Sequence, residues 1–210
     1  MRHLIIVAFL LSLIFGCTNE VAKQSNVIIL IDSTVSNKSD LIKLTRQTMH
    51  KAEDLITSDF MRYAGGSVKL SFINNNGANL PFDLIPIPKS LGRRKVNLKT
   101  MRDQLSISLK KIELILKKDK VYKESLILAG LFFYTESELD ADIFLVSDLA
   151  IVNRHANFEK LKLMHPIPID PISNRLHIVQ VGIKGHTYKD REVINKWWRS
   201  SIVINSSTKL

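Results

Sequence analysis

The sequence contains one cysteine, Cys17, so no disulfide can form within the chain. Its first apolar run, residues 4–15, is shorter than the roughly 20 residues that a membrane-spanning helix needs. Glycine and proline are not abundant, with 8 and 6 residues, and neither a repeat nor a low-complexity tract is present. These absences exclude disulfide-stapled and low-complexity classes, and 45% hydrophobic with 24% charged residues is typical of a globular protein.

Common catalytic motifs are also missing. The sequence has no Gly-x-Ser-x-Gly elbow, no phosphate-binding Gly-x-x-x-x-Gly-Lys loop and no zinc-type His-Glu-x-x-His. Five histidines are scattered along the chain after its first segment, and we interpret them as structural or surface residues: His50, His155, His165, His177 and His186. We therefore expect a binding protein and not an enzyme.

The first segment has the pattern of an export signal. A basic start, Met1-Arg2-His3, precedes the apolar run, and Gly16 stands before Cys17. The residues Ile14-Phe15-Gly16-Cys17 resemble a bacterial lipobox, which implies cleavage after residue 16 and lipidation of Cys17. Residues 17–25 would then be a lipid-anchored tether in the bacterial cell envelope. Thr18, in place of Asp, favours the periplasmic face of the outer membrane if the organism is Gram-negative. An ordinary cleaved signal is the alternative.

Positive charge is concentrated in one segment. The formal net charge is +10, and between Lys89 and Lys123 twelve Lys and Arg stand against three Asp and Glu. We predict a basic interaction patch that includes Arg93, Arg94, Lys95, Lys99 and Arg102. Its partner would be anionic lipid, a cell-wall polymer or an acidic protein, and export argues against nucleic acid. The alternative is a solvated helix face.

Hydrophobic periodicity predicts alternating strands and helices. Strands are expected at 27–31, 67–73, 80–87, 141–146, 176–183 and 202–204, and helices at 37–62, 98–118, 123–137, 155–164 and 188–200. Asn74-Asn75-Asn76-Gly77 predicts a hairpin turn, and the proline-rich stretch 165–171 predicts an extended loop. Residues 26–210 are thus expected to form one α/β domain, a three-layer sandwich with a mostly parallel sheet, one antiparallel edge strand and helices on both faces. Trp197-Trp198 is either a binding patch or a pair with one ring buried and the other half-covered.

Two of the predicted central strands end in aspartate, at Asp32 and Asp148. Ligands of open α/β sheets bind at the carboxyl ends of the strands. Asp32 is followed by the hydroxyls of Thr34 and Ser36, and oxygen ligands with few carboxylates suit Mg²⁺. The alternative is that residues 32–36 form a turn and cap the next helix, with Ser36 or Ser39 as N-cap.

The pattern Asp32-x-Thr34-x-Ser36 after an apolar strand resembles the metal-ion-dependent adhesion motif of von Willebrand factor A domains, usually Asp-x-Ser-x-Ser. The resemblance spans roughly residues 26–200 and implies that Asp148 is the distal aspartate, although Leu149 follows it where the family usually has glycine. It also implies a middle-loop hydroxyl ligand, for which Ser125 is the first candidate and Thr100 the second.

Three functions remain open at this point. The first is a lipid-anchored module that binds a protein partner through Mg²⁺ held by Asp32, Thr34, Ser36 and Asp148. The second is a metal-free scaffold subunit of an envelope or conjugative-transfer assembly, with the basic segment 89–123 as its interface. The third is a metal-dependent hydrolase, which the lack of a general base beside the motif disfavours.

Overall fold

A computed structural model describes residues 24–35, 37–73, 81–89, 94–118, 126–149, 174–181 and 188–201, with the side chains of 94–97 and 188–190 left out. Its strands are β1 (Val27–Asp32), β2 (Ser67–Ile73), β3 (Asp83–Pro86), β4 (Asp142–Ser147) and β5 (Arg175–Gln180). Its helices are α2 (Lys38–Ser58), α3 (Phe60–Tyr63), α4 (Arg94–Lys118), α5 (Ile127–Ser137) and α7 (Tyr188–Ser201).

The five strands form one sheet in the order β3-β2-β1-β4-β5. β1 lies at its centre and pairs in parallel with β2 and β4, while β4 pairs in parallel with β5. β3 pairs antiparallel with β2 at the edge. All six residues of β1 are buried, as expected for an apolar run covered on both faces. The predicted mostly parallel sheet with one antiparallel edge strand is confirmed.

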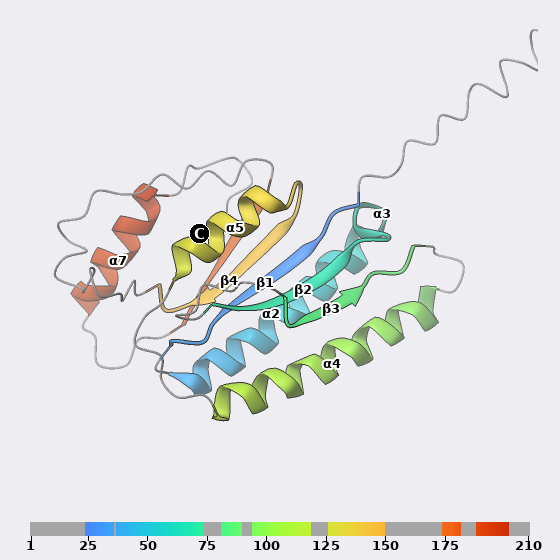
Figure 1. Cartoon of the computed structure of the whole chain (residues 1–210), viewed down its shortest axis with the longest axis horizontal. Coiled ribbons are helices and arrows are strands. Elements are labelled where there is room, and N and C mark those ends of the chain that lie inside the picture. Colours follow the sequence, from blue (N-terminus) through green and yellow to red (C-terminus); the bar gives the residue numbers. More distant parts are fainter. Residues whose placement is uncertain are drawn as a thin grey trace, which may run out of the picture.

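Helices cover both faces of the sheet (Figure 1). One core cluster joins alternate residues of β1, such as Ile29 and Ile31, to α2, α3 and α4. The other joins Ile28 and Leu30 to α5 and α7. Successive side chains of a strand point to opposite faces, so β1 contributes to both clusters. The three-layer prediction is therefore confirmed, and α2 and α4 run roughly along the direction of the strands (Figure 1).

Several boundaries differ from the sequence prediction. The helix expected at 37–62 is two helices, since α2 ends at Ser58 and α3 starts at Phe60. The N-cap of α2 is Asn37, whose side chain accepts from the backbone N–H of Asp40 at 3.4 Å, so the prediction of Ser36 or Ser39 is wrong. An amide oxygen serves there as well as a hydroxyl.

Two burial predictions are also corrected. β5 was expected to be a buried strand, but of its six residues only Leu176 is buried. Within the described ranges β5 pairs with β4 alone and lies at the edge of the sheet, which leaves it less covered. Trp197 and Trp198 are 5% and 1% exposed, so neither ring is half-covered and the pair is no surface binding patch.

Some predictions concern residues outside the described ranges. They are the signal segment with Cys17, the turn 74–77, the helix 155–164, the loop 165–171 and the strand 202–204. Arg93, Ser36 and Ser125 also lie outside these ranges. Of the helices in the described part of the chain, none has the length and apolar character that would cross a membrane.

Candidate functional site at the carboxyl ends of β1 and β4

The candidate site lies at the carboxyl ends of β1 and β4, the two neighbouring strands between which the order of the sheet changes direction. From β1 the chain proceeds to β2 and β3 on one side, then crosses to β4 and β5 on the other. The carboxyl ends of β1 and β4 therefore form the topological switch point, where open α/β sheets bind ligands. Asp32 ends β1, and Ser147 and Asp148 stand at the end of β4.

Asp32 is fully buried, and hydroxyl groups hydrogen-bond both of its carboxylate oxygens. Oδ1 accepts from the Thr34 hydroxyl at 2.5 Å and from the Thr34 backbone N–H at 3.0 Å. Oδ2 accepts from the hydroxyl of Ser147 at 2.7 Å. These donors stabilise the charged form of a carboxylate that burial would otherwise disfavour. The hydrogen bond from the Thr34 backbone N–H to Asp32 is also a turn interaction, so the prediction that Asp32 belongs to a turn is correct. The prediction that residues 32–36 cap the next helix is wrong, because Asn37 caps α2.

Ser147, which the sequence interpretation did not assign to the site, links the two strand ends. Its hydroxyl donates to Asp32 and accepts from the backbone N–H of Leu149 at 2.9 Å. Donating and accepting at once fixes the orientation of the hydroxyl. Asp148 lies between Ser147 and Leu149 in the sequence and is 7% exposed. One carboxylate, that of Asp32, and two hydroxyls are thereby gathered at neighbouring strand ends, and Asp148 follows directly in the chain.

Leu149 has a left-handed backbone, with φ of 62°. This is the position at which the resembled family usually has glycine, the residue that adopts this conformation without strain. Leucine is held there because its side chain is 3% exposed within the core and its carbonyl accepts from the Trp198 ring N–H at 2.9 Å. The strand end thus keeps a glycine-like backbone shape with a leucine in place.

Leu149 offers a test of this backbone strain. Leu149→Ala and Leu149→Gly both empty the same part of the core, but only glycine relieves the left-handed conformation. We expect Leu149→Gly to be about 1 kcal/mol more stable than Leu149→Ala, the reverse of the usual order. Urea unfolding of both variants measures this difference. An alanine variant as stable as the glycine variant would contradict it.

The oxygen ligands at this end fit a hard divalent cation. Asp32, Thr34 and Asp148 supply carboxylate and hydroxyl oxygens only, the donor set that Mg²⁺ takes. Among the described residues, no group of three or more His, Cys, Asp or Glu side chains suited to a metal ion occurs, either at these strand ends or elsewhere. Lys38 donates to the carbonyl of Ser33 and brings a positive charge to this loop, which opposes the binding of a cation.

Thr100, the second candidate for the middle-loop ligand, lies at the wrong end of the sheet. It shares a small hollow with Pro86 and Pro88 beside the end of β3. Pro86 pairs with Ser67 at the start of β2, whereas Asp32 pairs with Ile73 at its end. Because β3 runs antiparallel to β2, the end of β3 lies beside the start of β2. Residues that follow β3 therefore lie at the edge of the sheet where the parallel strands begin. Thr100 is therefore excluded as a ligand beside Asp32.

The predicted basic patch is only partly described. Lys99 is exposed on α4, and the side chain of Arg102 is 54% exposed but forms an ion pair with Glu53 of α2. Arg94 and Lys95 belong to the first turn of α4, without described side chains. Lys111 is similarly paired with Asp83 at 3.1 Å. Part of the basic segment thus joins α4 to its neighbours.

A second polar cluster lies at the opposite, amino-terminal edge of the sheet, around Asp142. Its side chain is 1% exposed and accepts from Arg175 Nε at 2.7 Å and from the Tyr63 hydroxyl. His177 Nε2 lies 2.9 Å from it, and the His177 ring stacks on Phe144. Burial and the hydrogen bond to Asp142 raise the pKa of Tyr63 well above its usual value. These contacts join α3, β4 and β5, so we interpret the cluster as structural.

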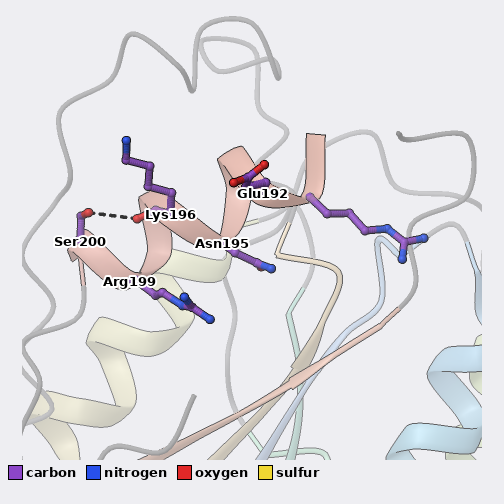
Figure 2. A pocket seen from close by; sticks show the side chains of 6 residues that line it. Glu192, Asn195, Lys196, Arg199 and Ser200 are labelled. Carbon is purple, nitrogen blue, oxygen red and sulfur yellow. Dashed lines mark hydrogen bonds between the residues drawn. The ribbon is translucent and has the colours of Figure 1, made fainter. Parts of the chain in front are cut away.

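A hollow of about 570 Å³ lies against α7 (Figure 2). Its described lining comes from that helix alone: Arg191, Glu192, Asn195, Lys196, Arg199 and Ser200. Charges of both signs are present, and the Ser200 hydroxyl donates to the Lys196 carbonyl within the helix. The side-chain oxygen of Asn195 accepts a hydrogen bond from the side-chain amide of Gln180 in β5. The hollow has the character of a solvated helix face and contains neither aspartate of the strand ends.

Comparisons with known proteins give little further information. No protein-family model matches this chain, and no curated protein sequence does. Among solved structures, the crystal structure of the human COPII-coat protein Sec24c is similar, with a TM-score of 0.42 and 11% sequence identity. The match covers 85% of this chain and 32% of that chain, so this chain spans about a third of that protein's length. A likeness at this level says nothing about function.

Proposed function

We propose that this chain is a binding module that engages a protein partner through a Mg²⁺ ion held at the carboxyl ends of β1 and β4. The observation that carries the proposal is the cluster in which Thr34 and Ser147 hydrogen-bond the two oxygens of Asp32, with Asp148 next in the chain. In this proposal an acidic side chain of the partner completes the coordination of the ion, as the resemblance to von Willebrand factor A domains implies.

The proposal extends to the residues outside the described ranges. Ser36 and Ser125 would add hydroxyl ligands, and a lipid on Cys17 would hold the module in the bacterial envelope. Support comes from the position of the cluster at the switch point and from its all-oxygen chemistry. A bound Mg²⁺ would supply positive charge for an anionic ligand, and the chain's own residues would hold the ion in place.

Magnesium binding is the first test. At a concentration ten times its dissociation constant, Mg²⁺ is expected to stabilise the protein by about 1.4 kcal/mol. For a domain of this size that raises Tm by roughly 3–6 °C. Asp32→Asn keeps the shape of the side chain but should abolish the shift, whereas Lys38→Met should increase it by removing a competing charge. Asp103→Asn, which removes an exposed carboxylate from α4, is the control and should shift like the unchanged protein.

Partner binding is the second test. A photoreactive residue replaces Ser39, an exposed position in the first turn of α2 beside the site, and the protein is crosslinked in the envelope of intact cells. We expect a crosslinked partner in magnesium that disappears with chelator and with Asp32→Asn. The same residue at Met61, exposed in α3, is the control. Equal crosslinking from Ser39 in chelator and in magnesium would reject the metal-mediated mechanism.

A further inference from the structure

Helix α4 has a buried side and an outer side with different properties. Its buried side packs Met101, Leu105 and Ile112 into the core that α2 and the sheet share. Its outer side carries Ile107 and Leu114, which are 54% and 57% exposed. They are seven residues apart and therefore lie on the same side of the helix, roughly 10 Å from one another along its axis. Figure 1 shows α4 at the outer edge of the helices that cover its face of the sheet.

Lysines surround these two aliphatic side chains. Lys110 lies three residues after Ile107 and four before Leu114, and Lys117 and Lys118 follow Leu114 by one turn, so all three are its helix neighbours. All three are exposed, and none forms an ion pair within the part of the chain that the structure describes. They differ in this from Arg102 and Lys111 of the same helix, which are paired.

We propose that this outer face of α4 docks on the surface of an anionic lipid bilayer. The three lysines would contact lipid phosphates, while the two aliphatic side chains enter the boundary between headgroups and acyl chains. A basic helix face with exposed aliphatic residues has the chemistry of a membrane-surface helix. It lacks the Trp, Tyr and unpaired Arg anchors that dominate protein–protein interfaces, which disfavours an acidic protein as the occupant. The proposal does not depend on the metal site.

Each lysine that reaches an anionic surface strengthens binding by roughly fivefold. Reversal of Lys110, Lys117 and Lys118 to Glu is therefore expected to weaken docking by about a hundredfold or more. Asp103 lies one turn before Ile107, is exposed and opposes the attraction, so Asp103→Asn should strengthen docking. Because surface charges are screened, docking should be lost at high salt.

The test mixes the full chain, with Cys17→Ser so that the introduced cysteine is the only thiol, with vesicles of phosphatidylglycerol and phosphatidylcholine, or of phosphatidylcholine alone. An environment-sensitive fluorophore is attached through Ile107→Cys, and nitroxide-labelled lipid quenches any fluorophore that enters the bilayer. The control position is Phe133→Cys, 44% exposed in α5 on the other face of the sheet. Circular dichroism confirms that each variant is folded.

We expect quenching at position 107 on phosphatidylglycerol vesicles, and loss of quenching in 0.5 M NaCl, on phosphatidylcholine or with the three lysines reversed. Position 133 should stay unquenched throughout. Equal quenching at both positions, or on both lipids, would overturn the proposal. So would a solvent-exposed fluorophore at 107 on anionic vesicles, the result that an acidic protein partner predicts. Magnesium dependence of partner crosslinking is unaffected by any of these results, so the two proposals fail separately.

Discussion

Arg175→Met is expected to lower the free energy of unfolding by about 3 to 5 kcal/mol, since it leaves a buried carboxylate without its main charged partner. Asp142 is 1% exposed, and Arg175 contacts it with both Nε, at 2.7 Å, and a terminal nitrogen. The Asp142 carboxylate cannot become solvated unless the start of β4 moves, because Asp142 and its neighbours Ala141 and Ile143 are all fully buried. Chemical denaturation followed by circular dichroism measures the loss.

Arg46→Met is the matched control for this prediction. It removes the same side chain from an ion pair with Glu113, but Arg46 is 53% exposed and the pair is solvated. An exposed pair contributes less than about 1 kcal/mol. Adding Asp142→Asn to Arg175→Met should restore part of the stability, because the neutral amide no longer requires a cation. If Arg175→Met costs no more than Arg46→Met, the Asp142 cluster does not hold the edge of the sheet together.

Gly66→Ala is expected to destabilise the protein by about 3 kcal/mol, because the added methyl group has no space. A Cβ at Gly66 would lie 2.2 Å from the backbone oxygen of Ser25. Ser25 cannot move away freely, since its N–H donates to Arg62 at 3.1 Å and the chain enters β1 two residues later. Gly66 itself accepts from the N–H of Ile87 at 2.9 Å, which fixes it from the other side.

Gly65→Ala gives the comparison. Gly65 has φ of 81°, so alanine is strained there by about 1 to 2 kcal/mol, but the atoms nearest to its Cβ belong to the flexible side chains of Gln24 and Lys89 and not to the backbone. Thermal and urea unfolding should thus rank Gly66→Ala as the more damaging of two adjacent substitutions. The opposite ranking would show that Ser25 gives way easily and that the entry to β1 is not tightly packed.

The layers of the fold were predictable because they depend on local patterns. The five-residue apolar run 27–31 has the composition of a strand buried on both faces, and α4 shows helical spacing of its core residues. What failed depends on long-range contacts. The break at Asp59 has no proline or glycine to mark it, and the exposure of β5 follows from its place at the edge of the sheet, which its apolar sequence does not encode.

The candidate site was predictable in part for the same reason. Strand ends in aspartate can be identified locally, but the hydrogen bond from Ser147 to Asp32 joins residues 115 positions apart. The Asp142 cluster was missed, although a signal was present. An aspartate inside a predicted buried strand requires a partner, and Arg175 and His177 are two residues apart on another strand, so they share a face. Ile107 and Leu114 give no local signal of exposure, because an aliphatic residue in a helix is equally compatible with the core, and only the packing of α4 leaves them exposed.

The alignment of α4 with the strands has a consequence for how an anchored molecule would meet its partner. With α4 lying flat on a bilayer, the strands would run parallel to the membrane plane (Figure 1). The sheet edge formed by the ends of β1 and β4 would then face sideways, while the chain enters the domain at the opposite edge, next to Gly66. Such a geometry favours a neighbour in the same membrane over a protein on an opposing surface. Under the two proposals above, the module would act in cis, gathering components laterally within one leaflet.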